Sequence, residues 1–289
     1  MLDKDYNRVI SKVYMNVGIV TPGRICPGVN VAISEITIRE SRSGNRVFGF
    51  FEGWRGLNHD LREEIPFNSL RYDGGSILCT SPDLLDISQA ECSLRHLDKL
   101  YCIGDRRAQN GAAKIAKTTD VNTVGLLTSV DRDVGFGFNT LVREHVEKVK
   151  CAHTTAFATH TVFFIEVPSN DVARRVGMIS PFVDVVITTD SYEDHLFDVE
   201  NAFAIEGKAV VVVTKHSPIR KIIDTLQSND VATVFIPFDQ AVMGAEPCIY
   251  DTVLAKRMVV ESYNVCKTKH NFCKTATGVV YYEKNIRVM

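Results

Sequence analysis

The chain has 289 residues, 45% of them hydrophobic, which is more than one average domain needs and ample for a sizeable core. Its 33 lysines and arginines against 35 acidic residues give a formal net charge of −2, without the basic excess of a dedicated nucleic-acid binder. We therefore expect one large or two modest globular domains and no nucleic-acid partner.

Short β-branched runs alternate with amphipathic stretches along the chain, a pattern that predicts βαβ units and parallel sheets. In the first half, the predicted elements are a strand in VYMNVGIV (13–20), a turn in TPGRICPG (21–28), a helix in VNVAISEITIRES (29–41), a strand in RVFGFF (46–51), a helix end and strand in LDKLYCIG (97–104), and a loop or short strand in VNTVGLLTS (121–129).

The second half repeats this alternation. Its predicted elements are a helix in 138–156, strands in 160–167, 183–189 and 208–215, a helix in 217–230 that opens with Ser217 as N-cap and Pro218, a strand in 231–238, and a long helix in 250–265. The fold class that follows is α/β, with two similar Rossmann-like three-layer α/β/α domains, mainly parallel sheets and a cleft between them. We assign residues 1–132 plus about 247–275 to the first domain, and residues 133–246 plus the C-terminal tail to the second.

The sequence gives no sign of a membrane segment or a secretory signal. No apolar run reaches the roughly 18–20 residues that cross a bilayer, and the N-terminal MLDKDYNRVISK (1–12) is too charged for a signal peptide. The eight cysteines lack paired spacing, which is typical of reduced thiols. Cys266, His270 and Cys273 could begin a zinc site, although a structural zinc normally has a fourth ligand. We expect a cytoplasmic protein without membrane contact or bound metal.

Motifs between the predicted elements resemble, in order, those of the phosphofructokinases. The matching segments are GIVTPGRICPGVNVAI (18–33) for the first strand, turn and helix; FGFFEGWRGL (48–57) for the next strand and turn; DGGSILCTSP (73–82) for G-G-[ST]-x-L-G-[ST]-x-R; IGDRRAQNGA (103–112) for I-G-G-D-G-S; AKTTDVNT (116–123) for P-K-T-I-D-N-D; VGFGFNTLV (134–142) for T-x-G-F-x-T-A; and YDTVLAKRM (250–258) for the late helix. Each match alone is weak, but their shared order is specific. The chain resembles a short, divergent member of this family.

The resemblance implies an ATP- or pyrophosphate-dependent 6-phosphofructokinase, which transfers a phosphoryl group to the 1-hydroxyl of fructose 6-phosphate. Such a transfer needs a glycine-rich floor under the phosphates, a carboxylate for Mg²⁺, a second carboxylate as base, and cations for the sugar phosphate. The first domain would hold the nucleotide and the second the sugar phosphate. Gly23 and Gly104 would belong to the phosphate floor.

Many positions that would grip phosphate or metal carry other residues in this alignment. On the nucleotide side, the replacements are Arg24 for the second glycine of the first turn, Arg106 for the Mg²⁺-binding acid, Arg107 for the next glycine and Pro82 for an arginine. On the sugar side, they are Thr161 and Val231 for arginines, Pro168-Ser169-Asn170 for M-G-R, and Lys215 for an acid. An arginine cannot ligate Mg²⁺, because it is a permanent cation without an acceptor. We therefore expect no Mg²⁺ or nucleotide cofactor.

Asp120 stands at the position of the catalytic base, with Thr118 and Lys117 before it. Without a metal acid or sugar-phosphate arginines it would have no substrate to deprotonate, so we interpret it mainly as an ordinary turn or N-cap carboxylate. The alternative is a vestigial catalytic base. Arg106 and Arg107 could likewise be solvated loop residues or a new anion site, since paired arginines suit phosphate.

The expected function is that of a catalytically inactive phosphofructokinase-family subunit. The resemblance implies an oligomer, so the chain would serve as structural or regulatory partner of an active 6-phosphofructokinase paralogue in glycolysis, or otherwise form a homo-oligomer. The alternative is an active sugar-phosphate kinase with an altered donor or acceptor and Asp120 as base. A weaker alternative is a ligand sensor that uses the arginine pair.

Overall fold

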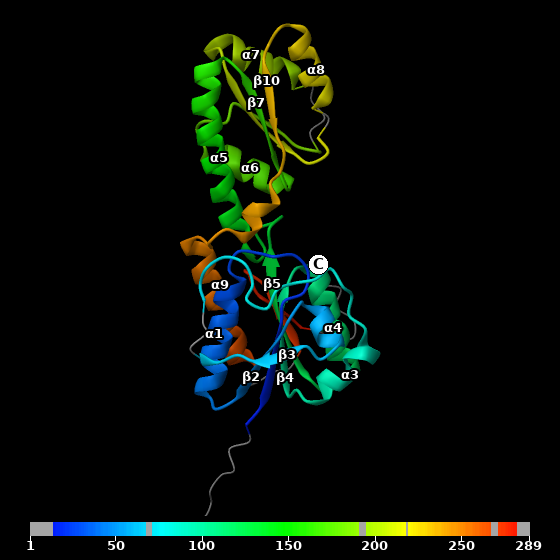
Figure 1. The fold of residues 1–289 in the computed structure, drawn as a ribbon. Coiled ribbons are helices and arrows are strands. Elements are labelled where there is room, and N and C mark those ends of the chain that lie inside the picture. The colour runs from blue at the N-terminus through cyan, green and yellow to red at the C-terminus, as the bar shows by residue number, and fades with distance from the viewer. Residues whose placement is uncertain (1–13, 68–70, 191–194, 218, 267–270, 282–289) are drawn as a thin grey trace, which may run out of the picture.

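The computed structural model describes residues 14–67, 71–190, 195–217, 219–266 and 271–281, which form two lobes (Figure 1). The larger lobe is built on an eight-stranded sheet and the smaller on a four-stranded sheet, and helices cover both. The expected α/β class with mainly parallel sheets is confirmed, with one sheet in each Rossmann-like lobe.

The larger sheet has the strand order β12-β11-β5-β4-β1-β2-β3, and β6 also pairs with β5. Only β3 and β12 run antiparallel to their neighbours among the strands described. The strands are β1 (Asn16–Val20), β2 (Arg46–Phe50), β3 (Arg62–Glu64), β4 (Lys99–Gly104), β5 (Asn122–Ser129), β6 (Phe136–Gly137), β11 (Phe272–Lys274) and β12 (Val279–Tyr281).

Helices cover the two faces of this sheet because its central strands are apolar on both sides, as buried parallel strands are. One core contains Ile33 of α1, Met258 of α9 and Ile19 of β1. The other contains Trp54 of α2, Leu94 of α3 and Ile115 of α4. The bounds are α1 (Val29–Arg42), α2 (Trp54–Asn58), α3 (Ile87–Arg95), α4 (Arg106–Thr118) and α9 (Ile249–Val265).

The smaller sheet is parallel throughout, in the order β10-β7-β9-β8. Helices α5 and α6 bury one of its faces, and α7 and α8 pack on the other. Its elements are α5 (Phe138–Thr159), β7 (Val162–Val167), α6 (Asn170–Ile179), β8 (Val185–Ile187), α7 (Leu196–Glu206), β9 (Ala209–Thr214), α8 (Arg220–Ser228), β10 (Thr233–Ile236) and the 3-10 helix η2 (Gln240–Gly244).

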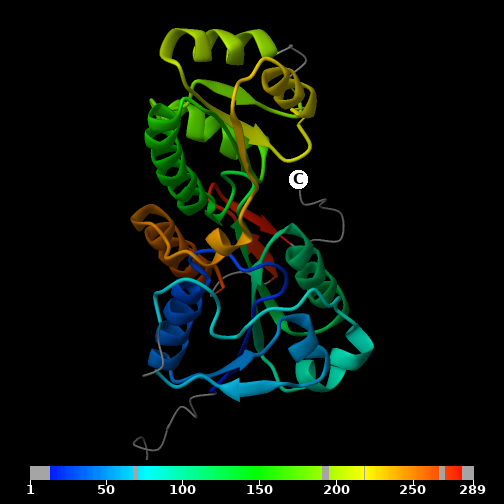
Figure 2. The ribbon, with the colours of Figure 1, turned by 45° about the horizontal axis from the view of Figure 1, so that its top comes forward.

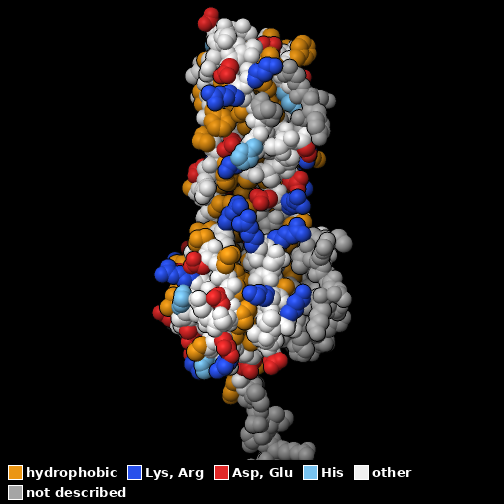
Figure 3. Space-filling model, turned by 90° about the vertical axis from the view of Figure 1, so that its right-hand side faces the viewer, with side chains coloured by type: hydrophobic (Ala, Val, Ile, Leu, Met, Phe, Trp, Pro, Cys, Tyr) orange, Lys and Arg blue, Asp and Glu red, His pale blue; other side chains and the backbone are white. Residues whose placement is uncertain are grey.

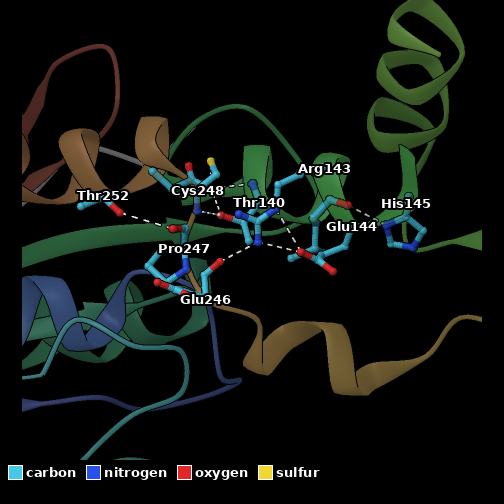
Figure 4. A network of polar contacts seen from close by, with 10 residues as sticks. Thr140, Arg143, Glu144, His145, Glu246, Pro247, Cys248 and Thr252 are labelled. Atoms are coloured by element: carbon cyan, nitrogen blue, oxygen red, sulfur yellow. Dashed lines mark hydrogen bonds and ion pairs between the residues drawn. The ribbon is translucent and has the colours of Figure 1, made fainter. Parts of the chain in front are cut away.

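The lobes are joined where α5 leaves the larger lobe and where the chain returns to α9 (Figure 2). The buried carboxylate of Asp251 accepts hydrogen bonds from the Thr140 amide (2.7 Å) and hydroxyl (2.6 Å) in the first turn of α5. The Cys248 amide donates to the same hydroxyl (3.0 Å), and Arg143 donates to the Glu246 carbonyl (2.7 Å) (Figure 4). The start of α9 thus caps the start of α5 at the junction.

Several sequence predictions differ from the structure. Residues 122–129 form a full strand rather than a loop or short strand. Ser217 does not cap α8, whose N-cap is Ile219; its hydroxyl pairs with that of Thr214 (2.8 Å), and Pro218 lies outside the described residues. The C-terminal tail, as far as it is described, pairs through β12 with β11 in the larger sheet, whereas the sequence-based division assigns it to the second domain.

Candidate functional site

The parallel register brings the turns after β1, β4 and β5 to one edge of the larger sheet. Gly104 at the end of β4 pairs with Leu127 near the end of β5, and Val20 pairs with Cys102. We call this the carboxyl edge; it faces the smaller lobe (Figure 1). Ligands of open α/β sheets bind in the crevice at such an edge.

Gly23 and Gly104 lie close together at the carboxyl edge, and their predicted role as a phosphate floor stays a prediction. Gly23 has a left-handed backbone (φ 95°), which glycine adopts without strain. A Cβ on Gly104 would lie 2.7 Å from the Pro22 carbonyl oxygen and 2.5 Å from the Ala108 Cβ, so only glycine lets the first turn approach α4.

The amino terminus of α4 meets this floor, but it already carries an anion. The Asp105 carboxylate accepts hydrogen bonds from the amides of Arg107 (2.9 Å) and Ala108 (3.1 Å). A Cβ built on Gly23 would lie 3.6 Å from the same carboxylate. Free amides and the helix dipole make such a terminus a phosphate site. Here Asp105 occupies that position.

Arg106 and Arg107 begin α4 and are exposed, so the structure does bring them next to Gly23 and Gly104. Asp105 uses one carboxylate oxygen to cap the helix, and Arg106 offers no acceptor. Mg²⁺ needs oxygen ligands in near-octahedral geometry, so this donor set does not fit it. Among the described residues, no three acidic, histidine or cysteine side chains converge on a common metal position.

Lys117, Thr118 and Asp120 lie at the opposite edge of the sheet. Helix α4 ends at Thr118, whose hydroxyl donates to the Lys114 carbonyl (2.9 Å), and β5 begins only at Asn122. The 13 residues of α4 separate Asp120 from the floor by about 20 Å at 1.5 Å per residue. The assignment of Asp120 as a vestigial base therefore has no geometric support, because a base must reach the carboxyl edge.

The segment at the end of β5 is Ser129-Val130-Asp131-Arg132-Asp133, in which Ser129 is the last residue of the strand. It has the hydroxyl, the apolar residue and the two acids at the spacing of T-I-D-N-D. Sequence analysis placed this motif one element too early, because AKTTD also offers a lysine, hydroxyls and an acid. The signal that could have located it is the apolar run VGLL (124–127), after which residues emerge at the carboxyl edge.

Asp131 lies in a mixed electrostatic environment at this edge. Partial desolvation raises its pKa, the guanidinium groups of Arg24 and Arg132 oppose that shift, and the charge of Asp105 adds to it. Asp133 forms an ion pair with Arg175 of α6 (3.4 Å). Both acids of the motif therefore lie beside arginines.

A polar cleft of about 540 Å³ lies between the carboxyl ends of the two sheets. The Ser169 hydroxyl joins the lobes: it donates to the Asp131 carbonyl (2.7 Å) and accepts from the Val172 amide (3.2 Å) at the start of α6. The cleft is lined by Asp131, Arg132, Pro168, Ser169, Asn170, Asp171, Arg174, Thr189, Asp190, Thr214 and Lys215. Lysine and arginine side chains gather here between the lobes (Figure 3).

Part of this positive charge is neutralised within the cleft. Arg174 pairs with Asp190 (2.6 Å) and Asp171 (3.8 Å). The Thr188 hydroxyl and Arg174 lower the pKa of Asp190 by hydrogen bonding to its carboxylate. Lys215 forms no ion pair with another described residue of the chain, and it lies where the resemblance places an acid.

The three residues that could begin a zinc site are Cys266, His270 and Cys273. Burial raises the pKa of the Cys266 thiol to about 11, which disfavours a metal-binding thiolate. Cys273 is buried in β11, and His270 lies outside the described residues.

Within the described part of the chain, no helix combines the length and the apolar character that a bilayer crossing requires.

Comparison with known proteins agrees with this architecture. A family model described as phosphofructokinase matches residues 16–266. The ATP-dependent 6-phosphofructokinase of Sulfurihydrogenibium sp. is 24% identical over 271 residues, 84% of each chain. That of Corynebacterium efficiens is 31% identical over 183 residues, or 57% of this chain, and the match spans only 51% of that relative.

The solved structures extend the likeness to the fold. The pyrophosphate-dependent phosphofructokinase from Marinobacter aquaeolei superposes with a TM-score of 0.78 at 14% identity, over 93% of this chain and 83% of that one. A family model that matches most of the chain, a shared two-lobed fold and a glycine floor at the carboxyl edge agree with one another. The chain therefore belongs to the phosphofructokinase family.

Proposed function

We propose that the chain is a catalytically inactive subunit of the phosphofructokinase family, which acts in cytoplasmic glycolysis as structural or regulatory partner of an active 6-phosphofructokinase. The observation that carries this proposal is the Asp105 carboxylate, which caps α4 and lies over the Gly23 turn. The chain thus supplies its own anion at the position where a donor phosphate would bind.

Electrostatics supports the loss of nucleotide and pyrophosphate binding. A phosphate placed on the α4 terminus would meet the Asp105 charge at close range, and two like charges 4 Å apart repel by about 1 to 4 kcal/mol near a protein surface. A Mg²⁺ ion would offset such a repulsion, but Arg106 stands at the position of the acid that would hold the ion. On the donor side, the Arg107 and Ala108 amides are therefore already bonded to Asp105, and no acid stands at the position that would hold the metal.

The acceptor side supports the same function. In the cleft, Pro168, Ser169 and Asn170 stand where the resemblance places M-G-R. Thr161 and Val231, which precede β7 and β10 at the edge of the smaller sheet away from the cleft, carry no charge where the resemblance places arginines, so they bear on the sugar site of a neighbouring subunit. A sugar phosphate gains its affinity from charge-assisted hydrogen bonds, which neutral side chains cannot replace. The fold persists while many positions that would contact phosphate carry other side chains, which supports a subunit kept for assembly.

The test combines an assay with a purification. The purified chain should show no phosphorylation of fructose 6-phosphate with MgATP or with pyrophosphate. Affinity purification from the native source should recover an active phosphofructokinase chain with it. Turnover that Asp131→Asn abolishes and the matched Asp120→Asn leaves intact would overturn the proposal.

A second candidate function is that of a sugar-phosphate kinase with an altered donor or acceptor. Asp131 favours it, because this acid lines the cleft and its pKa is raised by partial desolvation, which makes the ionised form a stronger base. Asp131 takes over the role that sequence analysis gave to Asp120. The same pair of variants decides between the two functions.

A further inference from the structure

His145 lies on α5, beyond Thr140 and Arg143 of the lobe junction (Figure 4), and its side chain is completely buried. Its Nδ1 is 2.7 Å from the Leu141 carbonyl oxygen. Because a carbonyl oxygen only accepts, Nδ1 carries the ring proton and Nε2 is left as an acceptor. Nε2 is also buried, and it receives no hydrogen bond from any described residue. The ring is therefore neutral in this packing, and its second nitrogen faces no donor.

The chain between β10 and α9 covers this histidine. We call residues 237–247 the return segment, because they lead from the smaller lobe back to the larger one (Figure 2). Phe238 of this segment stacks on the His145 ring, with the ring centres 5.8 Å apart and the planes inclined by 12°. The Phe238 amide donates to the Glu166 carboxylate of β7 (2.9 Å), whereas its side chain packs against the core of the larger lobe. Phe238 therefore joins the two lobes while it lies on His145.

The charged groups around His145 already have partners. On α5 itself, Glu144 pairs with Arg143 (2.6 Å), and Lys148 pairs with Asp239 of the return segment (3.8 Å). A proton on Nε2 would therefore add a buried positive charge that no uncommitted carboxylate of these elements compensates. The charged groups on the other elements that pack against α5 are each hydrogen-bonded or ion-paired, and they are Glu166 of β7, Asp171, Arg174 and Arg175 of α6, and Asp251 of α9.

This burial makes the packing around His145 sensitive to acid. Burial lowers the pKa of His145, the Leu141 carbonyl and Glu144 oppose that shift, and Lys148 adds to it. A histidine that reaches water titrates near its ordinary pKa of about 6.5. The neutral ring therefore contributes its full stability above that pH, and the contribution is lost as pH falls toward the folded pKa. The return segment should open before α5 does, because it contains only the short helix η2 and few backbone hydrogen bonds.

We propose that His145 is an acid-sensitive latch that holds the return segment against α5. While the ring is neutral, it stays under Phe238 and the segment keeps the two lobes joined. When the ring takes up a proton it must reach water, and it does so by displacing Phe238 and opening the segment. The latch links acidification to the freedom of the lobes to move relative to each other. The inference does not rest on the proposed function, because neither His145 nor Phe238 lines the cleft.

Amide hydrogen exchange of residues 238–246 tests the latch, expressed as protection relative to an unstructured peptide so that the intrinsic pH dependence cancels. In the parent chain, protection of the segment should fall about tenfold between about pH 7.5 and pH 5.5, because the lower value is one unit below the ordinary histidine pKa. His145→Phe keeps an aromatic ring under Phe238 but cannot titrate, so its protection should be the same at both pH values. His145→Gln, which can still donate to the Leu141 carbonyl, should behave in the same way and serves if the first variant does not fold.

His153→Phe is the matched control, because His153 lies on the same helix and contacts Phe182 (ring centres 4.6 Å apart) but is only half-buried. This variant should keep the fall in protection. Strand β9 should be more protected than the return segment at both pH values, because the lobes stay folded when the segment opens. Nitrogen-15 spectra of labelled histidine should show the proton of the neutral His145 ring on Nδ1.

Four results would each overturn the inference: protection of the parent segment that does not respond to pH, non-titrating variants at position 145 that keep the response, equal protection of the segment and β9, or a neutral His145 ring with its proton on Nε2. Equal protection would mean that the whole chain unfolds rather than the return segment alone. None of these measurements depends on the kinase assay or on recovery of an active relative.

Discussion

The two edges of the larger sheet use carboxylates in opposite ways. At the amino edge, Glu40 is completely buried and accepts hydrogen bonds from Lys99 (2.9 Å), Tyr101 (2.8 Å) and Asn45 (2.6 Å). At the carboxyl edge, Asp105 caps α4 through backbone amides, and Asp131 lines the cleft close to the charges of Arg24 and Arg132. One edge uses its acid to hold the lobe together, and the other retains acids where ligands bind in related folds.

The difference shows at which edge side chains can change without harm to the fold. At the amino edge, Glu40 of α1, Lys99 of β4 and Asn45, just before β2, form one hydrogen-bonded network. Substitution of any one of them therefore breaks hydrogen bonds of this network. At the carboxyl edge Arg24 and Arg106 are exposed and Asp105 is half-buried, so these side chains can change while Gly23 and Gly104 hold the first turn against α4. Stability and ligand chemistry can therefore be separated by mutation.

The largest expected effect is at Glu40. Glu40→Gln leaves the Lys99 ammonium buried without a counter-charge, and breaking such a pair costs about 3–5 kcal/mol. Urea unfolding should show this loss, and Lys99→Met added to the same chain should recover part of it. Arg95→Ala removes an exposed pair with Glu91 and should change stability by less than about 1 kcal/mol. Equal effects of the two single variants would contradict the comparison.

Asp251 tests whether burial or position decides the role of an acid. It lies toward the carboxyl edge but is buried like Glu40, and it binds the Thr140 amide and hydroxyl. Asp251→Ala should destabilise the chain by about 1.5–3 kcal/mol, the range for hydrogen bonds to a charged group. Thr252→Ala, on the next position of α9, loses one long bond of 3.5 Å and should have little effect in the same unfolding experiment.

Asp105→Gly should show whether the Asp105 carboxylate only caps α4 or also prevents phosphate from binding at the start of this helix. Glycine is tolerated as N-cap, so the stability cost should be only a few tenths of a kcal/mol. Removal of the carboxylate frees the amides of Arg107 and Ala108, and pyrophosphate should bind at least tenfold more tightly by calorimetry. Asp86→Gly removes the equivalent cap of α3 and should leave pyrophosphate binding unchanged. Unchanged binding in Asp105→Gly would show that the acid is not what blocks the site.

Sequence reasoning succeeded where one element carries its own signal. The apolar run AVVVVT predicted the buried strand β9, and Gly23 and Gly104 lie together beside the start of α4, while their role under a phosphate stays a prediction. It failed at β5, whose first residues, Asn122 and Thr123, are polar. The segment was therefore predicted as a loop or short strand, and the acids that follow it were assigned no role.

Long-range partners were beyond the sequence. Glu40 and Lys99 are 59 residues apart, and nothing local to either indicates that the end of α1 meets the start of β4. Helix α7 is apolar enough to be taken for a buried element, yet only the packing of the smaller lobe shows which side stays exposed. The sequence predicts an element's character, whereas its neighbours depend on the assembled fold.

The smallest expected effect is the pH dependence of stability at Asp131. Its pKa is raised in the folded chain, so the folded state holds this proton more tightly than the unfolded state does. Its contribution is fully present below the unfolded pKa of about 3.9 and is lost as pH rises through the folded pKa. Asp131→Asn should therefore raise the melting temperature slightly at pH 7 and lose this advantage below about pH 3.9.

Asp190 in the same cleft should show the opposite sign. Its pKa is lowered by the Thr188 hydroxyl and Arg174, so its contribution is present above the unfolded pKa and disappears as pH falls through the folded pKa. Asp190→Asn should lower the melting temperature at pH 7 and converge with the parent in acid. Melting curves of both variants between about pH 3 and 7 provide the measurement. If both substitutions shifted stability in the same direction, the cleft would not hold the two acids in different electrostatic environments, and Asp131 would be a surface carboxylate like any other.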